Sequence, residues 1–299
     1  MIEIPFKRDF TCEYGVLEDV APNLRRVVAT NKGPFTYTGT GTYVVGRGKV
    51  AVIDPGPLLP EHIKALVAGL TGEEVTHQLI THTHNDHSPA AQPLKDATNA
   101  PTFGFGPHGS GRFEQGATVE AGGDRDFVPD VEVRDGDVIE GDGWSFDCVH
   151  TPGHCSNHIC YAWREAGALF TGDHVMGWST TVVSPPDGDM ADYMANLRKL
   201  LERADRIYYP THAGAITDPK PFVRALITHR EEREQQILSC LARGKGLIAD
   251  MVDEMYVGLN PNLILPARRS VFAHVVDLAE RGRIKADGGI AIDAQYGLV

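Results

Sequence analysis

Four side chains that can bind a metal ion lie within six positions of this chain. The stretch Leu79-Ile-Thr-His-Thr-His-Asn-Asp-His-Ser88 contains His82, His84, Asp86 and His87. A β-type run ends in the first two histidines, and the two-residue period of a strand places both imidazoles on one face of the strand end. The pattern then turns helical, so we expect Asp86 and His87 at the start of a helix, where they offer a second set of ligands.

Three further candidate ligands each follow a β-type run later in the chain. They are His154 in His150-Thr-Pro-Gly-His154, Asp173 in Thr171-Gly-Asp-His174, and His212 in Pro210-Thr-His-Ala-Gly214. Strand ends gather along one edge of a layered α/β domain, so loops that are distant in sequence can assemble a site there. Imidazole and carboxylate ligands suit Zn²⁺, and iron and manganese accept the same ligands. We therefore predict two metal positions, with zinc as the ion.

Two metal ions in such a site would supply a nucleophile. Ions about 3.5–4 Å apart share one water and lower its pKa toward about 7, so a hydroxide exists at neutral pH and can attack a carbonyl or phosphoryl centre. Asp86 and Asp173 are the candidate catalytic residues, because their oxygens bind metal and align the hydroxide. His158 and His174 either protonate the leaving group or support a ligand by a hydrogen bond. Cys155 is expected to be a structural thiol.

The elements that must position these residues follow from hydrophobic patterning. Short β-branched runs predict strands over residues 26–29, 42–45, 50–54, 78–81, 144–149, 159–163 and 207–209. Apolar residues at three- and four-residue spacing predict helices over 60–70 and 190–204. Residues 103–130 hold seven glycines with Phe103, Phe105 and Phe113, which indicates either a flap with aromatic contacts or a plain surface loop. Strands with helices between them predict an α/β sandwich over residues 1–217.

The pattern changes near residue 218. Residues 218–299 predict three helices, at 219–242, 246–256 and 261–281, and a hairpin over 283–293 that turns at Asp287-Gly288-Gly289. This is a winged-helix outline. The mixed-sign run His229-Arg-Glu-Glu-Arg-Glu234 is expected to form solvated ion pairs on the first of these helices.

Composition limits the partners. The 299 residues carry 28 Lys+Arg and 40 Asp+Glu, a net charge of −12, and 42% of them are apolar, which suffices for a folded core. Residues 218–299 are neutral, with 11 basic and 11 acidic residues, so the negative charge lies in residues 1–217. A basic excess, typical of nucleic-acid binding, is missing, so charge disfavours nucleic acid. The tail is expected to pack on the main domain or on a partner subunit, as in a homodimer.

Localisation and cysteine chemistry follow from two further patterns. No apolar run approaches the roughly 20 residues of a membrane span, and the first ten residues lack the plan of a secretory signal. We therefore expect a cytoplasmic protein with no membrane contact. The five cysteines are odd in number and contain no C-x-x-C pair, so neither a disulfide framework nor a zinc ribbon is indicated.

The ligand motifs resemble those of a known family. H-x-H-x-D-H, followed by T-P-G-H, G-D and a last ligand histidine, resembles the metallo-β-lactamase superfamily, whose fold is a four-layer αβ/βα sandwich. Three further runs and the winged-helix tail are similar to its lactamase-β-2-like branch. The runs are Asn31-x-Gly-Pro-Phe-Thr-x-x-Gly-Thr-Gly-Thr-Tyr43, Val52-Ile-Asp-Pro-Gly56 and His229-Arg-x-x-Arg-Glu-Gln-Gln-Ile237.

The resemblance implies a ligand for each metal position. One ion would be held by His82, His84 and His154, the other by Asp86, His87 and His212, and Asp173 would bridge them. Asp54 is similar to a buried aspartate that orients ligands from beneath the site. Thr211, Ala213, Asn85 and Gly41 depart from the usual pattern, which alters the rim of the site rather than the ligand types.

These observations favour a dinuclear hydrolase whose metal-bridging hydroxide attacks a small ester, thioester, lactone or related acyl substrate. One alternative, which the resemblance permits, is a phosphodiesterase, namely an endoribonuclease acting on single-stranded RNA. Acidity disfavours it, because a polyanion must approach a chain of net charge −12. A second alternative is a mononuclear iron thiol oxygenase.

Overall fold

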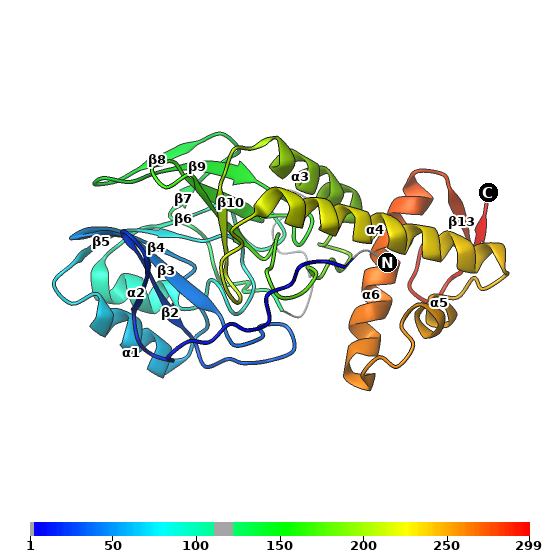
Figure 1. Ribbon diagram of the computed structural model, residues 1–299, viewed down its shortest axis with the longest axis horizontal. Coiled ribbons are helices and arrows are strands. Elements are labelled where there is room, and N and C mark those ends of the chain that lie inside the picture. The colour runs from blue at the N-terminus through cyan, green and yellow to red at the C-terminus, as the bar shows by residue number, and fades with distance from the viewer. Residues whose placement is uncertain (1–2, 111–121) are drawn as a thin grey trace.

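Two β-sheets face each other in the computed structural model, which describes residues 3–110 and 122–299 (Figure 1). The first sheet has seven strands in chain order: β1 (Glu18–Ala21), β2 (Leu24–Val28), β3 (Gly41–Arg47), β4 (Lys49–Ile53), β5 (Glu74–Leu79), β6 (Thr102–Gly104) and β7 (Val131–Glu132). The second has the order β12-β11-β10-β9-β8, with β8 (Val138–Glu140), β9 (Ser145–His150), β10 (Ile159–Trp163), β11 (Ala168–Gly172) and β12 (Ile207–Pro210).

Alternating apolar side chains give each sheet two buried faces. Tyr43 and Ile53 of the first sheet lie in one cluster with Phe146 and Phe170 of the second, which forms the core between the sheets. Residues with the opposite parity, such as Val44, point outward. There they pack against α1 (Pro60–Gly69) and α2 (Ala91–Thr98). The outer face of the second sheet is covered by α3 (Met190–Glu202) and the first half of α4 (Pro219–Ala242). The predicted four-layer αβ/βα arrangement is confirmed.

The C-terminal part has its own core. It contains α5 (Ile248–Met255), the 3-10 helix η1 (Pro261–Leu263), α6 (Ile264–Glu280), β13 (Ile284–Asp287) and β14 (Gln295–Leu298). Ile237 and Leu241, late in α4, pack in this core, whereas Phe222 and Leu226, early in the same helix, pack on the sandwich. Figure 1 shows α4 running from the sandwich into the C-terminal part. One helix thus contributes to both cores.

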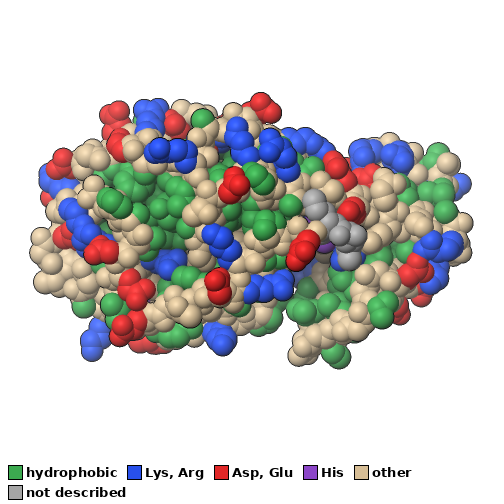
Figure 2. Space-filling model, viewed as in Figure 1, with side chains coloured by type: hydrophobic (Ala, Val, Ile, Leu, Met, Phe, Trp, Pro, Cys, Tyr) green, Lys and Arg blue, Asp and Glu red, His purple; other side chains and the backbone are tan. Residues whose placement is uncertain are grey.

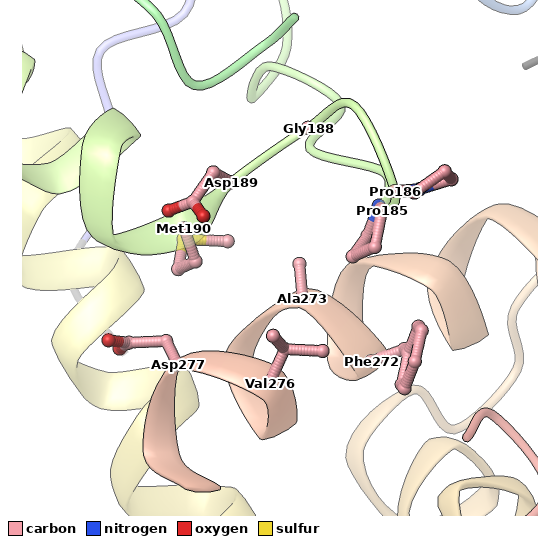
Figure 3. Close-up of a pocket in the computed structure, with 9 residues that line it drawn as sticks. All are labelled: Pro185, Pro186, Gly188, Asp189, Met190, Phe272, Ala273, Val276 and Asp277. Atoms are coloured by element: carbon pink, nitrogen blue, oxygen red, sulfur yellow. The ribbon is translucent and has the colours of Figure 1, made fainter. Parts of the chain in front are cut away.

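Helix α6 lies against the sandwich. Figure 3 shows the loop that carries Pro185 and Pro186 facing Phe272, Ala273 and Val276 of this helix. A cavity of about 330 Å³ remains between the two surfaces. The C-terminal part therefore contacts the sandwich along α6 as well as through α4.

Two local predictions around the ligand motif were wrong. Strand β5 ends at Leu79, so His82 and His84 lie in the loop beyond it rather than on a strand end. Asp86 and His87 lie in a turn closed by the hydrogen bond from His87 N–H to His84 O (2.9 Å), and α2 begins only at Ala91. Pro89 disfavours helical geometry at the residue before it, which delays the helix.

Two predictions in the C-terminal part were also wrong. Gly288 and Gly289 do adopt positive φ angles, but Asp287 pairs with Gln295, so the second strand of the hairpin starts well after the expected position. The buried side chain of Tyr296 explains this register, because it fills the C-terminal core. Arg230, expected in a solvated ion pair, is buried because it lies on the inward face of α4.

Two further expectations concern chain segments rather than ligands. The segment 103–130 was expected to be either a flap or a plain surface loop, and its residues 111–121, which include Phe113, lie outside the described residues. Across residues 3–110 and 122–299, no helix combines the length and the hydropathy needed to traverse a bilayer.

Candidate metal centre

The predicted ligands converge because they follow strands that end at one edge of the sandwich. His82 and His84 follow β5, and His154 follows β9. Asp173 and His212 come directly after β11 and shortly after β12, which are parallel neighbours in the second sheet. All seven candidate ligands lie in three groups, and within each group the ligand atoms are within 4.8 Å of one another. The groups overlap because His82 and His87 belong to two of them each.

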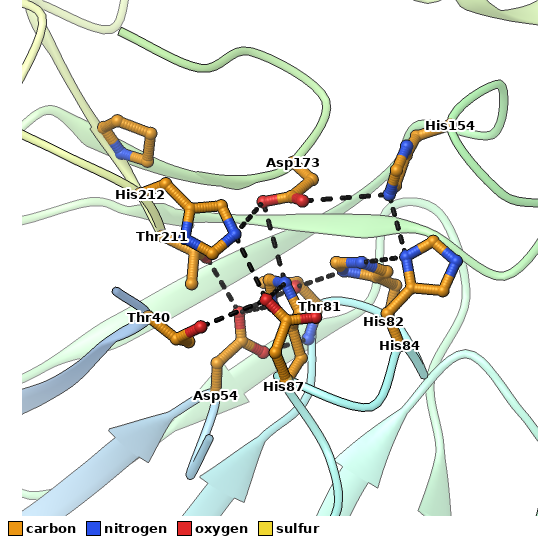
Figure 4. Close-up of polar contacts among 12 residues, drawn as sticks. Thr40, Asp54, Thr81, His82, His84, His87, His154, Asp173, Thr211 and His212 are labelled. Atoms are coloured by element: carbon orange, nitrogen blue, oxygen red, sulfur yellow. Dashed lines mark hydrogen bonds and ion pairs between the residues drawn. The ribbon is translucent and has the colours of Figure 1, made fainter. Parts of the chain in front are cut away.

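The first group joins three imidazoles. His84 Nδ1 lies 2.9 Å from His82 Nε2 and 2.9 Å from His154 Nε2 (Figure 4). Nitrogens bound to one tetrahedral zinc at about 2.0–2.1 Å lie roughly 3.3 Å apart, so this spacing is close to that of a shared ion. Other atoms of the rings are held in place, since His154 Nδ1 lies 2.6 Å from Val182 O.

The second group joins two imidazoles and a carboxylate. Asp86 Oδ2 lies 3.5 Å from His87 Nε2 and 3.3 Å from His212 Nε2. Asp173 lies between the two groups: its Oδ1 is 3.4 Å from His212 Nε2, and its Oδ2 is 3.8 Å from His154 Nε2. One carboxylate therefore directs an oxygen toward each group.

Two buried polar atoms indicate that the centre suits a cation. His87 Nε2 and Asp173 Oδ1 are buried and make no hydrogen bond with any described residue. Burial would lower the pKa of His212, but the carboxylates of Asp173 and Asp86 outweigh burial and raise that pKa to about 10. Positive charge at this position is what the carboxylates stabilise, and a divalent ion supplies it as well as protons do. The donor set therefore fits divalent metal ions.

Asp54 holds the centre from beneath. Its carboxylate, buried at the end of β4, accepts hydrogen bonds from the N–H and hydroxyl of Thr81 (both 2.8 Å) and from the hydroxyl of Thr211 (3.0 Å). His87 Nδ1 lies 2.9 Å from Asp54 Oδ2, which leaves Nε2 facing Asp86 and Asp173. A carboxylate in this position fixes the tautomer and orientation of a ligand imidazole, as the resemblance implied.

Gly41 and Thr211, two of the positions that depart from the usual pattern of the family, contact each other. The N–H of Gly41 donates to Thr211 O (2.9 Å), and a Cβ at position 41 would lie 3.0 Å from that oxygen. A larger residue at position 41 would force the two segments apart. The close approach also brings Thr40 to the centre, where its hydroxyl donates to Asp86 Oδ2 (3.0 Å).

The two candidate leaving-group acids lie behind the ligands. His158 is fully buried, its Nε2 accepts a hydrogen bond from Asp173 N–H (3.2 Å), and its Nδ1 lies 2.9 Å from Thr151 Oγ1. This is the supporting role. His174 is also fully buried, and burial lowers its pKa to about 3. Neither histidine is among the described residues that line the cavity beside the centre.

That cavity measures about 590 Å³, within the usual range for a small-molecule site. Five candidate ligands line it together with Phe35, Pro57, Met176 and Val182, and α6 adds Leu265, Pro266 and Arg269. Figure 2 shows the hollow between the sandwich and the C-terminal part, with Lys and Arg interspersed among Asp and Glu over the face turned to the viewer.

Sequence patterns gave no sign of several of these residues. Thr40 lies just before β3 and Thr81 two residues beyond the end of β5, and nothing in the runs that contain them indicates the hydrogen bonds that they donate to Asp86 and Asp54. Leu265 and Arg269 lie in a helix whose sequence has an ordinary amphipathic pattern. No local motif indicates that this helix borders a cavity whose metal ligands lie more than fifty residues earlier in the chain. Cys155, expected to be structural, is buried, and its thiol donates to Asn157 Oδ1 (3.3 Å).

Known proteins share both parts of this architecture. A family model of the metallo-beta-lactamase superfamily matches residues 37–212, and one of the beta-lactamase associated winged helix domain matches residues 248–292. A beta-lactamase domain protein from Burkholderia ambifaria has the same fold, with a TM-score of 0.80 at 19% identity over 97% of this chain and 96% of that one.

Two curated relatives carry names that bear on function. The lactamase-like protein aptB of Emericella nidulans is 30% identical over 256 residues, which span 81% of this chain and 76% of that protein. The atrochrysone carboxyl ACP thioesterase of Aspergillus terreus is 30% identical over 232 residues, 77% of this chain and 66% of that protein. With its centre of clustered histidines and aspartates and its C-terminal winged-helix domain, this chain belongs to the metallo-beta-lactamase superfamily and is a hydrolytic enzyme.

Proposed function

We propose that this enzyme is a dinuclear zinc thioesterase. His82, His84 and His154 would hold one zinc ion, Asp86, His87 and His212 would hold the other, and Asp173 would offer an oxygen to each. The observation that carries the dinuclear assignment is the position of Asp173, which directs Oδ1 toward His212 and Oδ2 toward His154. Iron or manganese would accept the same ligands, but borderline Zn²⁺ is the ion that a site rich in imidazole suits best.

The side chains around the ions keep the reactants in place. When bound, the ions lower the pKa of a water molecule and polarise the substrate carbonyl. Oxygens of Asp86 and Asp173 accept a hydrogen bond from the attacking water and align it. The hydroxyl of Thr40 donates a hydrogen bond to the carboxylate of Asp86, and His158 Nε2 accepts one from the backbone N–H of Asp173. These contacts fix the carboxylate of Asp86 and the backbone that carries Asp173 before the reaction begins.

Whether the leaving group needs a proton determines which class of acyl substrate suits the site. Apart from the candidate ligands, the described residues that line the cavity include no carboxylate, histidine or lysine that could protonate a leaving group. An alkoxide needs a proton to leave, whereas a thiolate, with a thiol pKa of about 8.5, leaves as the anion. The site therefore suits thioesters better than oxygen esters. Names of relatives, such as the thioesterase of Aspergillus terreus, support the same substrate class.

Neither alternative has comparable support. A ribonuclease needs several cations along its substrate path, and Arg269 is the single Lys or Arg among the described lining residues. A mononuclear iron oxygenase would use one group of ligands and leave Asp86, His87 and His212 without a role.

Metal analysis and a matched substrate panel test this proposal. Protein purified without added metal is expected to contain two zinc ions per chain, and it should hydrolyse a thioester at least about 100-fold faster than the oxygen ester of the same acyl group. His84→Ala serves as the blank. One iron per chain with oxygen uptake, or RNA cleavage that His84→Ala abolishes while thioesters stay intact, would overturn the assignment.

A further inference from the structure

Arg269 is a cation of the substrate cavity that the proposed chemistry does not use. It lies on α6, is exposed, and borders the same cavity as His84, Asp86 and Asp173. No hydrogen bond or ion pair joins its guanidinium to any residue in the described part of the chain. By contrast, Arg281 at the far end of α6 pairs with Asp277 at 2.9 Å.

Arg269 is the single Lys or Arg among the described residues that line the cavity. Leu265 and Pro266, one helical turn before Arg269, present apolar surface, as do Phe35 and Met176 of the sandwich. An apolar cavity with one charged group set apart from the reacting centre fits a ligand with an apolar body and one complementary charge. Because the guanidinium has five donors in a planar fork, the complementary group is a carboxylate or a phosphate.

The net negative charge of the chain supports a specific role for Arg269 in binding an anionic substrate. The chain carries a net charge of −12, so an anionic substrate would be repelled unless the cavity supplied local positive charge. The proposed metal ions supply it at the reacting end. Arg269 supplies it at the wall formed by α6.

We infer that Arg269 selects thioesters that carry a second, anionic group, a carboxylate on the acyl chain or a phosphate on the thiol portion. This inference rests on the proposed thioesterase activity. Arg269 acts in binding alone, because the charge that it contacts is remote from the carbonyl that reacts. Its loss is therefore expected to raise KM and to leave kcat unchanged.

Three thioesters with a six-carbon acyl chain distinguish the two possible positions of the anionic group. The S-hexanoyl ester of N-acetylcysteamine is neutral, the S-adipoyl ester adds an acyl carboxylate, and S-hexanoyl pantetheine 4′-phosphate adds a phosphate on the thiol side. Arg269→Gln is expected to raise KM about 10- to 100-fold for one of the two anionic substrates and to leave the neutral one unchanged, as loss of a charge-assisted hydrogen bond predicts. The substrate that is affected identifies the source of the charge.

Two variants control for charge and for folding. Arg269→Lys keeps the charge without the fork and should give an intermediate KM. Arg224→Gln removes an exposed arginine of α4 that has no partner among the described residues and lies outside the described cavity lining, and it should behave as wild type on all three substrates. Equal changes on all three substrates in Arg269→Gln, or no change on any, would overturn the inference.

A binding measurement separates this inference from the proposed function. Calorimetry of wild type and Arg269→Gln with hexanoate, adipate and pantetheine 4′-phosphate needs no turnover. Wild type is expected to bind adipate or the phosphate at least about 10-fold more tightly than hexanoate, and Arg269→Gln should lose that preference. If no thioester is hydrolysed but this preference exists and depends on Arg269, the thioesterase proposal fails and anion selection stands. If thioesters are hydrolysed and no preference exists, the reverse holds.

Discussion

Asp54 illustrates how a single residue outside the substrate cavity can control the ligands. It accepts three hydrogen bonds from Thr81 and Thr211 and holds His87 through Nδ1. Asp54→Asn replaces one acceptor oxygen with a donor, so His87 loses its fixed tautomer. We expect about 10- to 100-fold weaker metal binding in a chelator competition. Thr211→Val removes only one hydrogen bond and should weaken binding much less; equal affinity in Asp54→Asn and wild type would contradict this role.

Buried thiols make a second prediction at the residue scale. Burial, with a smaller contribution from nearby carboxylates, raises the pKa of Cys148 from 9.0 to about 12, and burial likewise raises that of Cys160 to about 12. Between pH 9 and 12 the folded state therefore binds more protons than the unfolded state. The free energy of unfolding should fall as pH rises through this range, by about 1.4 kcal/mol per pH unit for each thiol.

Urea unfolding at pH 8.5 and pH 10.5 measures this fall. The double variant Cys148→Ala/Cys160→Ala should show a shallower decline than wild type, whereas Cys12→Ala, at a partly exposed site, serves as the control. An identical decline in the double variant and wild type would show that both thiols ionise normally in the folded protein.

At the scale of elements, Gly153 sets how α3 meets the ligand loop. Its φ is +135°, and a Cβ there would lie 2.4 Å from Tyr193 Cα and 2.5 Å from Tyr193 N, which are backbone atoms that cannot rotate away. Gly153→Ala should push α3 from the loop that carries His154, and we expect a loss of more than about 3 kcal/mol in urea unfolding, with weaker metal binding.

Gly136 offers a matched comparison for that substitution. It also has a positive φ, of +86°, but no atom lies within 4 Å of the position of its Cβ. Gly136→Ala therefore tests backbone strain alone, at about 1–2 kcal/mol. If the two variants lose the same stability, the contact with α3 has no measurable effect.

Elements differ in how far sequence patterns could predict them. Helix α4, predicted at 219–242, is Pro219–Ala242, because proline at the first turn and a long apolar period define it locally. The two-residue strand β7 was missed because it is exposed on both residues and is formed only by pairing with β6. The ligand residues were identifiable from their types and spacing. The wall formed by α6 was not, because it depends on packing between segments far apart in the chain.

At the scale of the whole molecule, α4 links the two cores. The boundary predicted at residue 217 removes Phe222 and Leu226, which cover the outer face of the second sheet. We expect a fragment ending at residue 217 to aggregate, because it exposes this apolar surface. A fragment ending at residue 230 keeps Phe222 and Leu226 but omits Ile237 and Leu241, which pack in the C-terminal core, and it should recover soluble protein. Soluble yield and thermal melting measure the difference. A 217-residue fragment as stable as the full chain would show that the boundary separates independent domains.

The shared cavity has an evolutionary consequence. Every candidate metal ligand lies between residues 82 and 212, whereas Leu265, Pro266 and Arg269 lie on a helix of the C-terminal part. Substitutions on that helix can change which molecules are accepted without altering a residue that performs the reaction. Paralogues with the same seven ligands can therefore diverge in substrate through this one helix, and exchange of α6 between them would transfer the preference.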